Sequence, residues 1–474
     1  MPHSPVSTAM RRRAKTTSEV CADDLADPLA PLRDLPELAA GPPLVAPDAS
    51  ARARRGARTR TTRLQVNSHV HLPPNFSAFD SVEQEVDLAA DEGLRALGAS
   101  NYYDFGVYAR FAHEAQARGV FPLFGVEIMC LLEELQLAGL RINDPANPGR
   151  MYLCGKGITG FAPMSARAQR LMARIRDADG ARMDAMIARM TAHLSSRGVA
   201  TRVTAASIRS ALARRHAVAA SSVHLQERHV AQAFQEALFA SVEPGARSGL
   251  LRRVLGVECD ADALTAQNEI RSQLMKAGKP AYVEESCLDA DTAYALVLAL
   301  SGVPCYPILA DGASPVCEFE ASAEQLASAL AARAIWCVEF IPSRNAAAVV
   351  DHYATTLRRA GIIVLAGTEH NTVELKPMTP ECKGGVAVSA DATELFWEGA
   401  CVVAAHQYLS VRGRPGYVDA RGRLNPDFTT SDQRVSAFAR LGSTVIKAFR
   451  EPRGELTPAA LSPATTRAAG SARS

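Results

Sequence analysis

Four apolar segments of the sequence each end in a group of polar residues, and this repetition constrains the fold more than any other feature. The four segments end near His71, Tyr102, Ile128 and Asn371. Short and nearly continuous apolar runs are typical of strands that are buried on both faces of a parallel sheet. Polar residues at the carboxyl ends of successive parallel strands are where α/β barrels place their chemistry. The pattern therefore predicts an α/β barrel with a functional site at one mouth.

The first segment ends in two histidines that are separated by one residue. It reads LQVNSHVH, and its histidines are His69 and His71. On a strand, residues i and i+2 point to the same face, and a rise of roughly 3.3 Å per residue places their Cα atoms about 6–7 Å apart. Neutral imidazoles are good ligands for zinc, iron, nickel and copper. His69 and His71 are therefore candidate metal ligands; the alternative is a half-exposed strand end that carries two histidines by chance.

The alternation of predicted strands and helices is interrupted in the middle of the chain. Two helical patterns separate the first three predicted strands, but residues 129–300 depart from this alternation. Residues 151–158 form a possible strand, and a long helical stretch follows in which Met186 and Met190 recur at helical spacing. We interpret these methionines as helix packing and not as a binding groove. Strand–helix alternation returns after this segment.

The pattern divides the chain into a central unit and flanking segments. Residues 63–412 are predicted to form one barrel-like unit, within which 129–300 is a mostly helical insertion. Residues 413–455 are assigned to a C-terminal extension. Residues 1–62 form a basic tail rich in Pro, Ala, Ser and Arg without apolar periodicity, which is typical of disorder. Residues 456–474 have the same character, so both tails are predicted to be disordered.

Charge and cysteine usage argue against several classes of protein. The formal net charge is +2, which gives no general attraction to polyanions, so nucleic acid is not an expected partner. The sequence has no apolar run near the roughly 20 residues that span a bilayer and no secretory signal core. Its 10 cysteines include no C-x-x-C pair, which argues against a zinc finger. We therefore expect a cytoplasmic protein with reduced thiols and no membrane association.

The ordered motifs resemble those of the PHP (polymerase and histidinol phosphatase) domain family. The family pattern is H-x-H, G-x-T-D-H, G-x-E, a mid-chain histidine and a late G-[ST]-D-x-H. The matching segments here are residues 69–71, 98–102, 125–127 and 367–371, and residues 226–234 resemble the helix start that carries the mid-chain histidine, His229. The resemblance implies a distorted (β/α)7-type barrel of parallel strands that binds divalent metals and hydrolyses phosphoesters.

Several ligand positions of the family are occupied by other residue types. These positions fall on Ser77, Asn101, Tyr102, Glu369 and Asn371. The metal ligands that the resemblance retains are His69, His71, Glu127 and His229. This reduced set implies one or two divalent ions (zinc, manganese or iron) and not a full three-metal centre.

The retained ligands suit a hydrolytic metal. Nitrogen and carboxylate ligands bind zinc, iron or manganese, and such an ion lowers the pKa of bound water toward about 7. Glu369 and His370 follow the last predicted strand and are the candidate catalytic residues, as ligand, bridge or base. Glu339 lies near another strand end, and it is a candidate acceptor because ligand histidines usually donate their second N–H to an acceptor.

Three cations are candidates for binding an anionic substrate. They are Arg228, Arg344 and Lys156, and the latter two each follow a strand-like run. A guanidinium can bind phosphate oxygens bidentately, whereas an ordinary surface cation is the alternative for each. His406, in the predicted closing helix, is a further candidate to line the pocket.

Three classes of function remain open from the sequence. The first is a metal-dependent hydrolase that acts on a small phosphorylated or otherwise anionic molecule. The second is a barrel that lost hydrolysis and serves as a binding or regulatory module, which the substituted ligand positions favour. The third is a nucleic-acid phosphodiesterase or exonuclease, against which the near-neutral charge argues. Metal content separates the first two classes.

Overall fold

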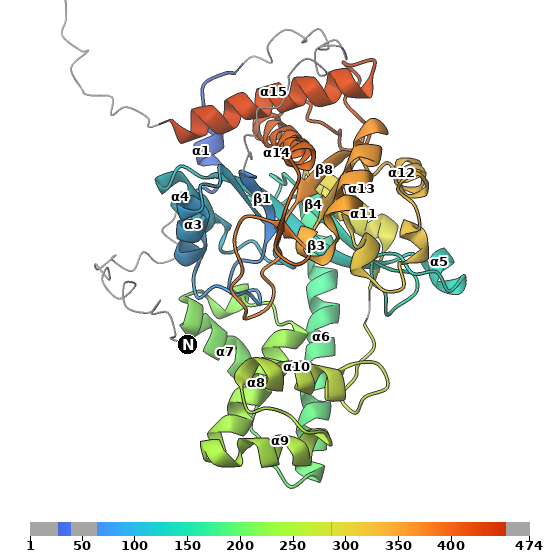
Figure 1. Cartoon of the computed structure of the whole chain (residues 1–474). Helices are drawn as coiled ribbons and strands as arrows, with labels where there is room; N and C mark the ends of the chain where they lie inside the picture. The colour runs from blue at the N-terminus through green and yellow to red at the C-terminus, as the bar shows by residue number, and fades with distance from the viewer. Residues whose placement is uncertain (1–26, 39–63, 286, 452–474) are drawn as a thin grey trace, which may run out of the picture.

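A single curved sheet forms the centre of the molecule (Figure 1). The structure, a computed structural model, describes residues 27–38, 64–285 and 287–451, and the remaining parts of the two predicted tails lie outside these ranges. The strands follow the order β1-β2-β3-β4-β6-β7-β8. Their bounds are β1 Val66–Val70, β2 Ala96–Ala99, β3 Phe121–Leu131, β4 Arg150–Lys156, β6 Val303–Ile308, β7 Cys337–Phe340 and β8 Ile363–Ala366.

The first and last strands of the path meet at the end of β1, which nearly closes the sheet into a barrel. The backbone N–H of His71 donates to the carbonyl of Glu369 at 3.0 Å, and the N–H of Glu369 donates to the carbonyl of His69 at 2.8 Å. Val70 and Glu369 form a parallel bridge at the same place. The predicted α/β barrel is therefore confirmed, and its closure lies beside the two histidines.

One strand of the barrel runs against the others, which the expectation of parallel strands did not include. β4 pairs antiparallel with β3 and with β6, whereas the other neighbours along the path are parallel. The connection from β3 to β4 contains only the short helix α5 (Glu133–Leu137) and turns. A parallel return usually runs through a helix that spans the sheet, and α5 has only 5 residues, so the chain comes back as a reversed strand. The short strand β5 (Leu288–Asp289) pairs with β3.

Helices cover the outside of the barrel, and serine hydroxyls cap several of them. Ser81, Ser322 and Ser389 each accept a hydrogen bond from the backbone N–H three residues later, as N-cap residues do. These covering helices are α3 Val82–Asp91, α4 Tyr108–Ala117, α11 Ala290–Ala299, α12 Ala323–Ala332, α13 Ala347–Arg359, α14 Ala390–Ser410 and α15 Ser431–Arg450. A two-stranded hairpin of β9 (Glu381–Cys382) and β10 (Val386–Ala387) precedes α14.

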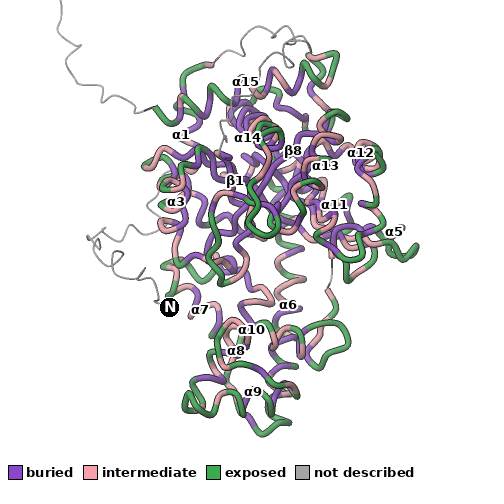
Figure 2. The backbone as a smooth tube through the Cα atoms, in the orientation of Figure 1, coloured by how far each residue is buried: buried purple, intermediate pink, exposed green. Residues whose placement is uncertain are grey.

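A helical insertion extends from the barrel between β4 and β5 (Figure 1). Its own apolar core is separate from the barrel core and contains Met186 and Met190, so these methionines pack between helices as predicted. Exposed residues are more prominent along this insertion than in the barrel (Figure 2). The insertion comprises α6 Ala166–Ser196, α7 Ala205–His216, α8 Glu227–Ala240, α9 Arg247–Leu255, α10 Ala263–Ile270 and the π-turn η4 Arg271–Met275. β4 lies within the span 129–300 but belongs to the barrel sheet.

The C-terminal extension and part of the N-terminal segment pack against α14. α15 crosses α14 at a point where a Cβ on Gly442 would lie 1.7 Å from the carbonyl oxygen of Cys401, so only glycine fits there. The short helix α1 (Ala30–Arg33) lies within the segment that was expected to be disordered, yet Leu29 and Leu32 are buried in the barrel core. None of the helices in the described part of the chain combines the length and apolar character that a bilayer crossing requires.

Candidate metal centre

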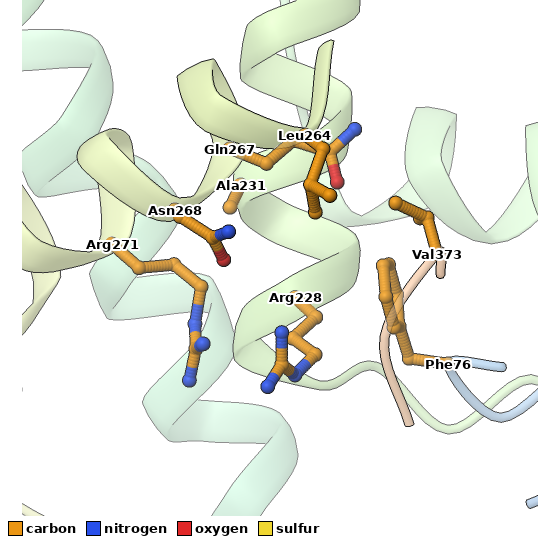
Figure 3. Close-up of a pocket in the computed structure, with 8 residues that line it drawn as sticks. All are labelled: Phe76, Arg228, Ala231, Leu264, Gln267, Asn268, Arg271 and Val373. Atoms are coloured by element: carbon orange, nitrogen blue, oxygen red, sulfur yellow. The ribbon is translucent and has the colours of Figure 1, made fainter. Parts of the chain in front are cut away.

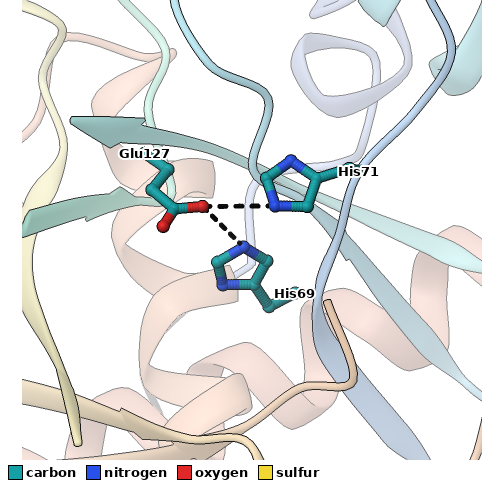
Figure 4. Close-up of side chains that lie close together, drawn as sticks. All are labelled: His69, His71 and Glu127. Carbon is teal, nitrogen blue, oxygen red and sulfur yellow. Dashed lines mark ion pairs between the residues drawn. The ribbon is translucent and has the colours of Figure 1, made fainter. Parts of the chain in front are cut away.

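Three buried side chains converge at the mouth of the barrel where β1 ends (Figure 4). The Nε2 atoms of His69 and His71 lie 3.4 and 3.2 Å from Oε2 of Glu127. Glu127 is contributed by β3, which is separated from β1 by β2 alone. The exposed fractions of the three residues are 1%, 0% and 5%, so water does not solvate their polar atoms freely. The predicted convergence of these three residues is present.

The three converging atoms lack partners within the described structure. Nε2 of His69, Nε2 of His71 and Oε2 of Glu127 are buried and form no hydrogen bond. Buried polar atoms without partners are rare in native proteins, because each costs about 1–3 kcal/mol. Bonds of about 2.0–2.2 Å to a tetrahedral ion place ligand atoms about 3.3–3.6 Å apart. The observed separations fit that requirement, so the donor set fits one divalent ion.

A carboxylate behind His69 fixes the orientation of its ring. Nδ1 of His69 lies 2.6 Å from Oε2 of Glu339, which is fully buried on β7. Oε1 of Glu339 accepts a hydrogen bond from the Ser68 hydroxyl at 2.6 Å. Glu339 therefore has the acceptor role expected from the sequence, and it directs Nε2 of His69 toward Glu127.

Electrostatics in this cluster favour a positive charge. Burial and Lys156 lower the pKa of His69, but Glu339 and Glu127 act in the opposite direction, and the pKa lies well above its usual value. Burial raises the pKa of Glu127, but His69 and His71 lower it far below the ordinary range. A proton on His69 and a metal ion are alternative ways to supply the positive charge that these carboxylates require.

Lys156 lies inside the barrel and not at its surface. Its ammonium is 2.7 Å from Oε2 of Glu339 and donates to the Ser68 carbonyl at 3.1 Å and to the Ser100 hydroxyl at 3.0 Å. These partners satisfy its donors, and 3% of the residue is exposed. The structure therefore gives Lys156 a buried ion pair instead of an open position for substrate. The pairing was missed because the sequence does not show which strand face turns inward.

A second group of potential ligands lies behind the first. His69, Cys154 and Glu339 also have ligand atoms within 4.8 Å of one another. Oε2 of Glu339 is already in contact with both the His69 ring and the Lys156 ammonium, which supplies a cation at this position. The group of His69, His71 and Glu127 is therefore the better place for a metal.

Three residues at positions where the motif resemblance would have metal ligands have structural partners instead. The amide of Asn101 accepts from the N–H of Leu72 at 2.8 Å and donates to its carbonyl at 3.1 Å, so it clamps the chain after His71. The Tyr102 ring stacks on His71 with a centroid distance of 5.2 Å and an interplanar angle of 10°. Ser77 accepts from the N–H of Phe79 at 3.1 Å. These side chains shape the wall of the site instead of supplying ligands.

His229 lies at the start of α8 and has other partners. Its Nδ1 accepts from the backbone N–H of Gln226 at 3.1 Å in a capping box, and its ring packs on Phe76 at 5.4 Å. Burial, together with nearby His216 and His224, lowers its pKa to about 3, so the ring is neutral. The structure does not group His229 with His69, His71 and Glu127.

Glu369 and His370 lie at the end of β8, where the backbone is unusual. Their φ angles are +63° and +50°, in the left-handed region that non-glycine residues rarely adopt. The Glu369 carboxylate contacts Arg344 at 2.5 Å and accepts from Asn371 at 2.9 Å. His370 has one ring nitrogen 2.6 Å from the Thr368 hydroxyl and the other 2.9 Å from the Lys376 carbonyl. Both contacts of Glu369 use its Oε2 atom, whereas both ring nitrogens of His370 are engaged, so Glu369 is the better candidate to take part in a reaction.

His406 is a structural residue and not part of the site. One ring nitrogen lies 2.8 Å from the carbonyl of Ser301, and the other accepts from the N–H of Tyr417 at 3.0 Å. Burial lowers its pKa to about 4. Both nitrogens are therefore committed to joining α14 to neighbouring loops.

Comparisons with known proteins give limited structural likeness. No protein-family model and no curated protein matches the chain. A proposed metal-dependent phosphoesterase from Bifidobacterium adolescentis is 16% identical, with a TM-score of 0.46 over 69% of this chain and 94% of that chain. An amidohydrolase from Chromobacterium violaceum, solved with sulfate and no metal, is 16% identical, with a TM-score of 0.44 over 67% of this chain and 93% of that chain. These values describe a distant similarity in the path of the backbone.

Proposed function

We propose that this protein is a metal-dependent hydrolase of a small phosphorylated or otherwise anionic substrate. The observation that carries the proposal is the convergence of three buried, unpartnered ligand atoms from His69, His71 and Glu127. When bound, a divalent ion such as zinc, manganese or iron supplies hydroxide from water at neutral pH. The donor set has room for one ion, and a second ion would need ligands from beyond these three residues.

The chain's own residues supply the remaining functions in this proposal. Glu339 holds the His69 ring so that Nε2 faces the ion, and Tyr102 excludes water from one face of His71. Glu369 is the proposed proton acceptor, because His370 has both ring nitrogens in hydrogen bonds. Arg344 is 39% exposed in its side chain beside Glu369, so it is the proposed contact for a substrate oxygen.

A second candidate function is a binding module that retains the barrel without hydrolysis. The observation that favours it is that Asn101, His229 and His370 are all engaged in hydrogen bonds within the protein. Because these side chains are already hydrogen-bonded within the protein, few groups are left to complete a catalytic centre. The described residues offer no comparable observation in favour of a nucleic-acid phosphodiesterase.

Metal content and a substrate screen together test the two functions. The purified protein is analysed for bound metals, depleted with a chelator, reloaded with zinc, manganese or iron, and assayed on phosphomonoesters and phosphodiesters. The hydrolase predicts metal-dependent turnover that is absent from His71→Ala. Metal binding without turnover on any substrate of the screen would favour the binding module, and an absence of metal binding would contradict the hydrolase.

A further inference from the structure

A small pocket lies where the helical insertion meets two loops of the barrel (Figure 3). The insertion contributes most of its wall, from α8, α10 and η4. The barrel contributes Phe76, from the loop after β1, and Val373, from the loop after β8. The full lining is Phe76, Arg228, Ala231, Leu264, Gln267, Asn268, Arg271 and Val373. Its polar groups include two guanidinium groups and no carboxylate.

Arg228 lacks a counter-ion in the described part of the chain. Its guanidinium lies 5.8 Å from the ring centroid of Phe76, and no carboxylate is within ion-pair distance among the described residues. Burial and the nearby charge of Arg271 lower its pKa to about 10. An unpaired, half-buried cation is costly, and an anion beside it would remove that cost.

Arg271 shares its one counter-ion with other cations. Its guanidinium is 3.6 Å from Glu227, which Lys276 also contacts at 2.9 Å and Arg182 contacts more closely. Burial raises the pKa of Glu227, but Lys276 and Arg182 lower it to about 2, so it is fully charged. Nε of Arg271 is buried and has no hydrogen-bond partner. Positive charge therefore exceeds negative charge around the pocket, and a buried donor is available.

The pocket borders the barrel mouth on the side of β8 and α8. Phe76 packs on His229 with a centroid distance of 5.4 Å. Burial lowers the pKa of Arg228 and the negative charge of Glu369 opposes that lowering, so Arg228 lies near this residue of the barrel mouth. A molecule that reaches from the metal centre past Glu369 would therefore meet Arg228.

We infer that Arg228 and Arg271 bind a second anionic group, a phosphate or carboxylate, of a substrate whose reacting group lies at the metal centre. The substrate part of this inference rests on the proposed function. Paired guanidinium groups bind such anions through several N–H donors, and the Asn268 side chain, which is exposed at the same pocket, adds an amide. The insertion would then select substrates by charge at a distance from the reacting bond.

The binding part is tested on metal-depleted protein, so that phosphate cannot bind through a metal. Inorganic phosphate is titrated by calorimetry into the wild type, Arg228→Gln, Arg271→Gln and Asn268→Asp. Each substitution is expected to weaken binding by about 10- to 100-fold, as the loss of a charged hydrogen bond does. Arg252→Gln, in the same insertion and 64% exposed in its side chain, is the matched control and should bind like the wild type.

Asn268→Asp guards against a folding artefact, because its side chain is exposed and the change adds a repelling charge. Absence of phosphate binding by the wild type, or unchanged affinity in all three pocket variants, would overturn the anion site. These results do not depend on hydrolysis, so they are distinct from failure of the proposed function.

The substrate part is tested by comparing the kcat/KM values of two substrates. Two substrates from the screen that differ by one carboxylate or phosphate remote from the ester are compared in wild type and Arg271→Gln. The ratio of their kcat/KM values should favour the doubly anionic substrate in the wild type and fall by about tenfold in the variant. Phosphate binding at the pocket with an unchanged ratio would instead indicate a separate free anion and overturn the substrate assignment.

Discussion

The two sides of the barrel mouth differ in how completely their polar atoms are satisfied. On the side of β1 and β3, His69, His71 and Glu127 direct unpartnered buried atoms at a common point. On the side of β8 and α8, His370 and His229 have hydrogen-bond partners within the protein. Both sides carry residues that a motif comparison would group together. Among these four histidines, only His69 and His71 have buried ring nitrogens without a partner in the described structure, which is what a metal ion would complete.

This difference indicates that a metal centre can be recognised by buried ligand atoms that have no hydrogen-bond partner. The residues of the β8 side hold loops, helix ends and strained backbone in place, and they can do so without an ion. The residues of the β1 side are stable only if something offsets the burial of their polar atoms, whether a proton or a metal. The predictions below test this contrast from its largest expected effect to its smallest.

The largest effect is expected from removing one unpartnered imidazole. His71→Ala should abolish stable metal binding and lower turnover by several orders of magnitude, because the source of hydroxide is lost. Neither ring nitrogen of His71 has a hydrogen bond to lose, so the free energy of unfolding should change by only about 1–2 kcal/mol. Metal content, rate and thermal midpoint are measured on the same preparation.

His406→Ala is the matched control for that experiment. Both ring nitrogens of His406 are in hydrogen bonds, so this variant should lose about 1–3 kcal/mol of stability and keep its metal. If the two variants lose metal to the same degree, the contrast between unpartnered and partnered histidines fails.

The next effect concerns the support behind His69. Glu339→Gln should weaken metal affinity by about 10- to 100-fold, as loss of a carboxylate behind a ligand histidine does. It should also lower the free energy of unfolding by about 3–5 kcal/mol, because Lys156 is left buried without its counter-ion. Glu320→Gln, which alters a buried carboxylate bonded to Tyr306 and to backbone N–H groups, should leave metal affinity unchanged.

A pH dependence follows from the raised pKa of His69 in the metal-free protein. The pKa is above that of the unfolded chain, so the stabilisation is fully present below about pH 6.5 and is lost as the pH rises through the folded value. A metal must displace this proton, so metal affinity should increase over the same range. The difference in thermal midpoint between zinc-loaded and metal-free protein should widen as the pH rises from about 6. A constant difference would show that no proton is exchanged for the ion.

The smallest effect on the metal is expected at His229. His229→Ala removes a helix cap and should lower stability by about 0.5–2 kcal/mol, while metal affinity stays within about twofold of the wild type. Calorimetric titration of zinc into the metal-free variant measures this. A loss of tenfold or more would place α8 in the metal centre and erase the difference between the two sides.

The sequence was sufficient to predict the barrel and the first half of the site. Apolar runs that end in polar residues predict where the strands lie and which of their ends carry the site. The spacing of His69 and His71 places both side chains on one face of their strand. Glu127 was expected from the resemblance of residues 125–127 to the G-x-E motif, and Glu339 was expected because it lies near a strand end. Each of these signals is local, which is why a single sequence carries it.

The features that sequence reasoning missed depend on contacts between distant segments. The reversal of β4 directs Lys156 inward to Glu339, which lies far away in the chain. The left-handed backbone at Glu369 and His370 arises where β8 meets β1, and no glycine marks it. The short helix α1 is ordered because Leu32 packs in a distant core, although its surroundings have a disordered composition. Long-range packing decides such features, and local patterns do not report it.

X-ray absorption spectroscopy of the zinc-loaded protein, with metal content determined on the same sample, tests the central claim most directly. Ligation by His69, His71 and Glu127 predicts about one ion per chain and a shell of nitrogen and oxygen atoms at about 2.0–2.2 Å. Protein without bound zinc would contradict the claim, as would a sulfur atom at about 2.3 Å, which would place the ion at Cys154 instead.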